Sequence, residues 1–234
     1  MTRSTRRLLP GVGRHLLRGI GRMLAIAALL AAALVAVALL VSSDDPALTG
    51  EPAIAPLRVT SGSEIATGFA VGRDRVVTVA HLLDETAKEG GTDALPRVRG
   101  IRAGVLRGRV LRIDRRSDLA LLAVRGLAGR SPEVAAAGAH DEVRVLRLRG
   151  GRPSSLVVRV RRPIVAHVRA LGAERAVTRP ALELTARVRA GDSGAPVVSG
   201  SGALAGVVFA TSRRRGNTAY AVDATAVTRL LARD

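Results

Sequence analysis

Cysteine is absent from the 234 residues, and the aromatic residues are limited to Phe69, Phe209 and Tyr220. Without thiols the chain has no disulfide bonds, no thiolate zinc site and no cysteine nucleophile. Three rings are too few for the stacking surfaces that bind single-stranded nucleic acids. Lys88 is the only lysine, so arginine carries almost all of the positive charge.

The net charge of +18 is distributed unevenly along the chain. Residues 1–22 contain six arginines and no acidic residue, and residues 42–56 contain three acidic residues and no basic one, which leaves +15 on residues 57–234. Such a charge often indicates nucleic-acid binding. Here most of it follows an apolar segment that predicts export, so we expect no nucleic-acid partner.

That apolar segment, residues 23–41, has no polar side chain. As a helix its nineteen residues would be roughly 28 Å long, enough to cross the hydrocarbon core of a bilayer. The arginines before it favour a cytoplasmic N-terminus. We therefore predict a basic cytoplasmic leader (1–22) and a single transmembrane helix (23–41) in the cytoplasmic membrane. The alternative, a cleaved signal peptide and secretion, is less favoured because signal h-regions are shorter, about 7–15 residues.

Residues 42–56 are rich in proline and small residues and are predicted to be a linker, and residues 57–234 form the remaining domain. Short apolar runs that alternate with arginine and are separated by turn residues indicate strands. The last segment, Asp223 to Leu231, has helical spacing and an N-cap candidate in Asp223. We predict an all-β domain closed by a C-terminal helix, with strands near 66–71, 76–80, 105–113, 119–124, 143–148, 155–160, 164–169, 181–188, 195–198 and 204–210.

Three residues in this domain stand where chemistry is expected. His81 ends an apolar run, Asp118 precedes another, and Ser193 lies in the glycine-rich turn GDSGAP at 191–196. A serine attacks acyl groups when an imidazole takes its proton and a carboxylate orients that imidazole. The glycine turn would aim the N–H groups of Gly191 and Ser193 at one point, an oxyanion hole in which each donor contributes about 3 kcal/mol.

Each residue also has a simpler interpretation. A histidine at a strand end is usually structural, and Asp114 lies close enough in sequence to take the role of Asp118. His140 and His167 are expected to be surface or packing residues. No histidine follows Ser193, which excludes the order of an α/β-hydrolase. No metal-ligand spacing is present, so neither a metal nor another cofactor is expected.

Taken together, TVAH at 78–81, SDLALL at 117–122 and GDSGAP at 191–196 resemble the trypsin-like (chymotrypsin-fold) serine peptidases. The similarity is greatest to HtrA-type and membrane-anchored periplasmic proteases of high-GC bacteria, and it covers roughly residues 57–234. It implies two packed six-stranded β-barrels with the active site in the cleft between them. It also implies a serine endopeptidase of the envelope that acts on polypeptides through a His81, Asp118 and Ser193 triad and an acyl-enzyme.

The chain departs from this family at Ala195, where a second glycine is usual. A catalytically weak or inactive fold that serves as an envelope binding module is therefore the alternative function. Asp192 has two interpretations: it binds a new N-terminus released by cleavage near residues 54–58, or it pairs with one of the many arginines. We favour the second.

Substrate preference follows only from position in the family. No acidic residue lies among the expected pocket residues, so we predict a small or medium apolar P1 residue rather than arginine or lysine. The charge of the domain predicts attraction to anionic lipid headgroups or wall polymers. The expected pocket residues are Arg187, Val188, Ala190, Phe209, Ala210, Thr211 and Thr218.

Overall fold

The computed structural model describes residues 54–83, 96–100, 104–168, 176–212 and 214–232. The elements in these ranges are strands apart from a short 3-10 helix, η1 (Ala80–Leu83), and one α-helix, α3 (Thr225–Leu231). The predicted leader, the predicted transmembrane span and most of the predicted linker lie outside the described residues. Within the ranges given above, no helix is long and apolar enough to cross a membrane.

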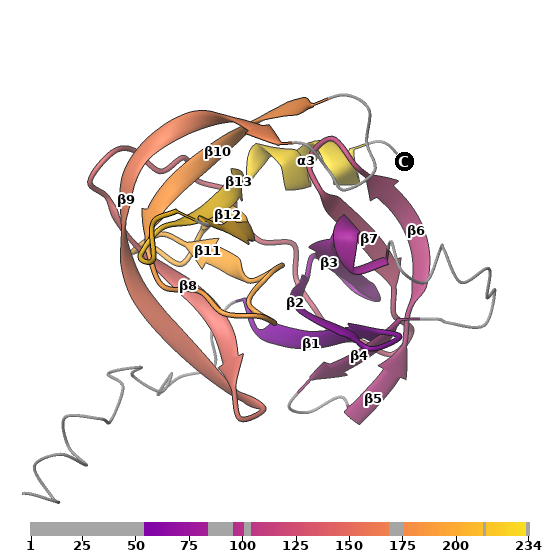
Figure 1. The fold of residues 1–234 in the computed structure, drawn as a ribbon. Coiled ribbons are helices and arrows are strands. Elements are labelled where there is room, and N and C mark those ends of the chain that lie inside the picture. The colour runs from indigo at the N-terminus through magenta and orange to yellow at the C-terminus, as the bar shows by residue number, and fades with distance from the viewer. Residues whose placement is uncertain (1–53, 84–95, 101–103, 169–175, 213, 233–234) are drawn as a thin grey trace, which may run out of the picture. The chain divides into compact units, whose positions relative to one another are not determined.

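The first half of the domain is a curled antiparallel sheet of seven strands (Figure 1). The two edge strands, β5 and β6, are consecutive in the chain and are separated by Gly108, whose N–H donates to the carbonyl of Pro96 at 2.7 Å. In sheet order the strands are β5 (Gly104–Arg107), β4 (Arg97–Gly100), β1 (Pro56–Ser61), β2 (Glu64–Ala70), β3 (Arg75–Val79), β7 (Leu119–Ala123) and β6 (Arg109–Asp114).

This sheet differs from the closed six-stranded barrel that the sequence predicted. The expected strand at 105–113 is divided at Gly108, so β5 pairs with β4 while β6 pairs with β7. Strands β1 and β4 were not among the predicted strands. Both are short and contain arginine, and they form because β1 pairs with β2 on one side and with β4 on the other.

The second half is a closed barrel of six antiparallel strands, as predicted. The expected strands at 155–160 and 164–169 form one long strand, β9, whose pairing with β10 shifts register between Glu183 and Leu184. Strand β13, which was not predicted as a strand, pairs with β10 and β12. Around the barrel the order is β10 (Val177–Thr185), β13 (Ala219–Asp223), β12 (Leu204–Thr211), β11 (Pro196–Val198), β8 (Glu142–Arg149) and β9 (Arg152–Val168).

Aliphatic side chains make up most of the core, as expected for a chain with so few aromatic residues. Strand β7 is buried along almost its whole length, and Phe69 on β2 is fully buried near it. Helix α3 lies beside β7 and buries Ala226, Val227 and Leu230. The carboxylate of Asp223 accepts a hydrogen bond from the N–H of Thr225, although the N-cap is Ala224, one residue after the predicted one.

Candidate active site

The first sheet brings His81 and Asp118 together. His81 lies in η1, directly after β3, and Asp118 lies directly before β7, which is the neighbour of β3. The imidazole Nδ1 is 2.8 Å from Asp118 Oδ2, and the backbone N–H of His81 donates to Oδ1 at 3.0 Å. Because the carboxylate only accepts, Nδ1 carries the proton and Nε2 is left as the acceptor. The imidazole is 46% exposed, whereas the carboxylate is 16% exposed.

The structure places the two candidate carboxylates differently. Asp114 ends β6 and accepts hydrogen bonds from the hydroxyl of Ser117 at 2.7 Å and from the N–H of Arg116 at 3.0 Å, so it holds the turn together. Asp118 follows that turn with a φ of +59°, a left-handed conformation that is uncommon for a residue with a side chain. This backbone conformation is sparsely populated and costs about 1–3 kcal/mol, and such strain clusters at functional sites.

The backbone of Ser193 is hydrogen-bonded to β2, which is the neighbour of β3, the strand that precedes His81. Its carbonyl accepts a hydrogen bond from the N–H of Thr67 on β2 at 2.7 Å. The hydroxyl of Thr78 on β3 donates to the carbonyl of the same Thr67 at 2.9 Å, which ties the two strands together beneath the loop. The hydroxyl of Ser193 forms no hydrogen bond with any described residue. Catalytic contacts often tighten only when substrate binds.

The approach of this loop to β2 depends on glycine. Gly194 has a φ of +83°, and a Cβ atom placed on it would lie 1.9 Å from the carbonyl oxygen of Thr67. No side chain fits at that distance. Ala195, the departure from the family pattern, does not have a positive φ and is fully buried. The backbone of the loop therefore tolerates alanine at 195 but requires glycine at 194.

Residues 189–192 form a turn that presents backbone donors. The N–H of Asp192 donates to the carbonyl of Arg189 at 3.0 Å, and Gly191, the third residue of the turn, has a φ of +89°. Both are features of a type II turn, which requires glycine at that place. In the part of the chain that the structure describes, the N–H groups of Gly191 and Ser193 donate to no acceptor. They are available to an oxygen atom of a ligand.

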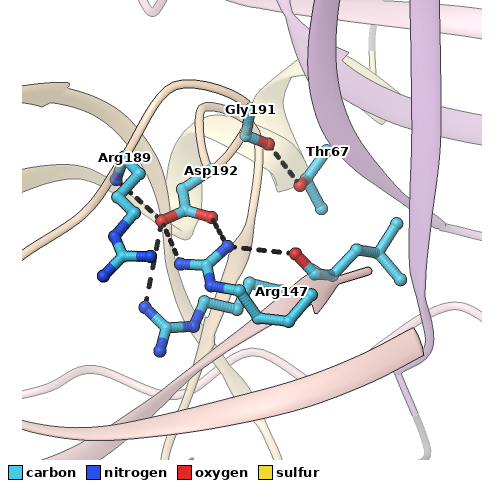
Figure 2. A network of polar contacts seen from close by, with 7 residues as sticks. Thr67, Arg147, Arg189, Gly191 and Asp192 are labelled. Atoms are coloured by element: carbon cyan, nitrogen blue, oxygen red, sulfur yellow. Dashed lines mark hydrogen bonds and ion pairs between the residues drawn. The ribbon is translucent and has the colours of Figure 1, made fainter. Parts of the chain in front are cut away.

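Asp192 is almost completely buried and is bound by arginine (Figure 2). Arg149 at the end of β8 makes two parallel contacts, at 2.7 Å to Oδ1 and 2.9 Å to Oδ2. The N–H of Arg189 donates to Oδ2 at 2.8 Å, and Arg147 Nη1 lies 3.9 Å from that atom. The arginine interpretation of Asp192 therefore fits the structure. Of the region 54–58, where the supposed new N-terminus would lie, residues 56–58 belong to β1.

The expected pocket residues differ in their exposure to solvent and in their contacts. Arg187, Ala190 and Thr211 are exposed, whereas Thr218 is buried and its carbonyl accepts from the hydroxyl of Thr211 at 3.2 Å. The ring of Phe209 packs under the guanidinium of Arg179, with 5.0 Å between the guanidinium carbon and the ring centroid. Val188 and Ala210 are partly exposed.

A cavity of about 340 Å³ opens beside Gly191, on the side of β2 and the end of β8. Of the expected pocket residues it contains only Ala190. Its other lining residues include Ile65, Thr67 and Arg149. Because Ala190 and Gly191 lie on its wall, the cavity borders the turn.

Sequence reasoning missed the arginines of the site. Arg147 and Arg179 are only 5% and 4% exposed, although strand arginines were expected to face solvent. A signal was present: Arg147 has the same parity along β8 as Val143 and Val145, so it points to the buried face. Among the described residues no group of three histidine or acidic side chains could hold a metal ion.

Comparison with known proteins finds one matching family and several solved structures of the same fold. The family described as "Trypsin-like peptidase domain" matches residues 66–207. The active form of the Rv3671c protease from M. tuberculosis is 27% identical, with a TM-score of 0.67, and the match covers 78% of this chain and 80% of that one.

Other solved structures share the fold at lower identity. The MamO protease domain from Magnetospirillum magneticum is 20% identical, with a TM-score of 0.61, over 76% of this chain and 95% of that one. Deg5 is 17% identical, with a TM-score of 0.59, over 76% and 86%. No curated protein matches the chain in sequence.

Proposed function

The chain belongs to the trypsin-like peptidase domain family, and on that premise we propose that it is a serine endopeptidase with Ser193 as its nucleophile. The observation that supports this most is the contact of 2.8 Å between His81 Nδ1 and Asp118 Oδ2, which leaves Nε2 of His81 free of a proton. The backbone of Ser193 is tied to β2, the strand beside β3. The order of the three residues is that of the family.

Acylation then follows from these groups. His81 Nε2 takes the proton of the Ser193 hydroxyl as Oγ attacks the carbonyl carbon of the scissile peptide bond. The imidazolium that forms keeps its Nδ1 proton on Asp118, whose negative charge stabilises it. The oxygen of the tetrahedral intermediate accepts hydrogen bonds from the N–H groups of Gly191 and Ser193, which the type II turn presents in advance.

Collapse of the intermediate breaks the C–N bond, and His81 gives its proton to the leaving amine. The acyl group stays on Ser193 Oγ until water, deprotonated by the same imidazole, attacks it and releases the carboxylic acid product. No other group is needed, so the proposed reaction consumes one water per peptide bond. The cavity beside Gly191 gives room to part of a bound polypeptide.

A fluorophosphonate probe tests the proposal, because it reacts with serines that a histidine activates. We expect covalent labelling of the wild-type chain and none of the Ser193→Ala variant. Ser199→Ala is a matched control, since this hydroxyl is hydrogen-bonded to Ser201 at 2.8 Å and stands outside the site. An unlabelled wild-type chain would refute the enzyme and favour the binding module.

We also propose that residues 23–41 anchor the enzyme in the cytoplasmic membrane with the peptidase domain outside. Support comes from the sequence alone: nineteen apolar residues preceded by six arginines. The +15 charge would then face anionic headgroups and wall polymers. Protease added to intact cells should degrade residues 57–234, and protection of the domain in intact cells would reverse this topology.

A further inference from the structure

Arg179 is a buried charge beside the candidate catalytic pair. It lies on β10 and is 4% exposed. Its Nη1 atom is 3.8 Å from Asp118 Oδ2, the same oxygen that His81 Nδ1 contacts at 2.8 Å. One carboxylate oxygen therefore faces two cationic or proton-bearing groups, one from each half of the domain.

The surroundings of Arg179 do not suit a charge. Its Nε and Nη1 atoms are buried and have no hydrogen-bond partner among the described residues. One face of the guanidinium is covered by the ring of Phe209. Burial lowers the pKa of Arg179, while the charges of Asp118 and Asp114 raise it. Arginine remains charged at neutral pH, so the fold retains a poorly solvated cation at this place.

Stability does not account for such a group. Burying a charge without a full set of hydrogen bonds is unfavourable, and replacement by an apolar side chain of similar volume is often neutral or stabilising. The contact with Asp118 is too long for a hydrogen bond. At this distance the charge of Arg179 changes the electrostatic potential at Asp118 and at the imidazole of His81 that is bound to it.

We propose that Arg179 is a positioning residue that acts through Asp118 to keep His81 neutral and ready to accept a proton. Asp118 alone favours the imidazolium form, which cannot act as a base. The positive charge of Arg179, 3.8 Å from the carboxylate, offsets part of that negative charge. It therefore disfavours a positive charge on His81. The inference rests on the proposed function, in which His81 is the base.

Several other charged groups belong to this environment. Asp114 at the end of β6 attracts Arg179 from the side of the turn. Helix η1, which carries His81, packs on β1, β2, β3 and β7. These strands contribute the charged residues Arg58, Glu64 and Arg75, while β7 contributes none. The experiment leaves all of these groups unchanged.

The test is the pKa of the His81 imidazole, measured by NMR titration of the full chain. The His81 signal is the one that disappears in His81→Gln. We expect Arg179→Met to raise this pKa by about one unit, the lower end of the effect of a nearby charge, because Arg179 acts through Asp118. Arg179→Lys keeps the charge and should shift it less. Arg159→Met removes an exposed arginine from β9 of the same barrel and should not shift it.

Activity gives a second, separate readout. The acidic limb of the pH profile of kcat/KM should move upward with the pKa, so Arg179→Met should lose roughly tenfold at a pH below the midpoint and little above it. A wild-type chain that hydrolyses nothing would refute the proposed function, yet the NMR shift would still support the electrostatic role.

An unchanged His81 pKa in Arg179→Met, or an equal shift in Arg159→Met, would overturn the inference. Should Arg179→Met fail to fold, Arg179→Gln provides the same loss of charge with a polar side chain. Failure of both to fold would also overturn it, because Arg179 would then be required by the fold itself.

Discussion

The contact between Arg149 and Asp192 is the most direct place to test how the site is held in shape. Arg149→Met removes both parallel hydrogen bonds from a carboxylate that is 1% exposed. Breaking a buried ion pair from one side costs about 3–5 kcal/mol. We expect about 3 kcal/mol, the lower end, because Arg149 is 28% exposed and Arg147 remains 3.9 Å from the carboxylate.

For a domain of this size that loss should lower the melting temperature by roughly 6–12 °C. The effect on catalysis should be larger than the effect on folding. Asp192 lies between Gly191 and Ser193, and a carboxylate that has lost both hydrogen bonds to Arg149 would move toward water and take the turn with it. Loss of one oxyanion donor lowers kcat by about 10²–10³-fold, and we expect a drop of that order with little change in KM.

The assay measures kcat and KM on a peptide or ester that the wild-type chain cleaves, together with thermal unfolding by circular dichroism. Arg152→Met is the matched control, because Arg152 is exposed on β9 opposite Arg149. In the double variant Arg149→Met with Asp192→Asn the buried carboxylate is neutralised as well, while Arg147 keeps its buried charge, so stability should return only in part and kcat should stay low. A variant that melts early but keeps its wild-type kcat would refute the positioning argument.

Two further predictions concern the loop and the N-terminal region. Gly194→Ala should destabilise the domain by at least about 2 kcal/mol, since φ is +83° and the new Cβ would meet the carbonyl of Thr67; Gly200→Ala, with no atom within 4 Å of its Cβ, should be nearly neutral in the same unfolding assay. Removal of residues 1–53 should leave active-site titration unchanged, because Arg149 and not a new N-terminus binds Asp192; a higher titre after removal would contradict this.

Local patterns in the sequence predicted the β-rich fold, and three short motifs predicted the family; the second barrel followed only from what that resemblance implies. Each of the motifs TVAH, SDLALL and GDSGAP is a short continuous segment. The candidate functional side chain and the residues that position it therefore lie within a few positions of each other in the sequence. Short apolar runs bounded by turn residues predicted most central strands, such as β3 and β12, with errors of one or two residues at their ends. The choice between Asp114 and Asp118 needed the structure, because only the pairing of β3 with β7 decides which carboxylate meets His81.

The errors arose where pairing between distant strands overrides local pattern. Strands β1, β4 and β13 contain few strongly strand-forming residues, and they exist because a neighbour supplies the hydrogen bonds. The division of the segment 105–113 at Gly108 depends on a bond to Pro96, which local sequence does not reveal. The expected P1 pocket rested on family position and stays a prediction; the ring of Phe209, one of its residues, packs on Arg179.

Arginines occupy two kinds of strand position, exposed ones that face solvent and buried ones that lie beside carboxylates. In β8, Arg144 is exposed, whereas Arg147, three residues later, must face the opposite side and is buried beside Asp192. In β10, Arg179 has the same parity as Ala181 and Glu183, which are both buried. Most arginines of the domain lie on strand faces that are exposed to solvent. Arg147 and Arg179, whose parity matches that of buried neighbours, place positive charge close to Asp192 and Asp118. Parity, rather than the total of +15, therefore indicates which arginines lie buried beside these two carboxylates.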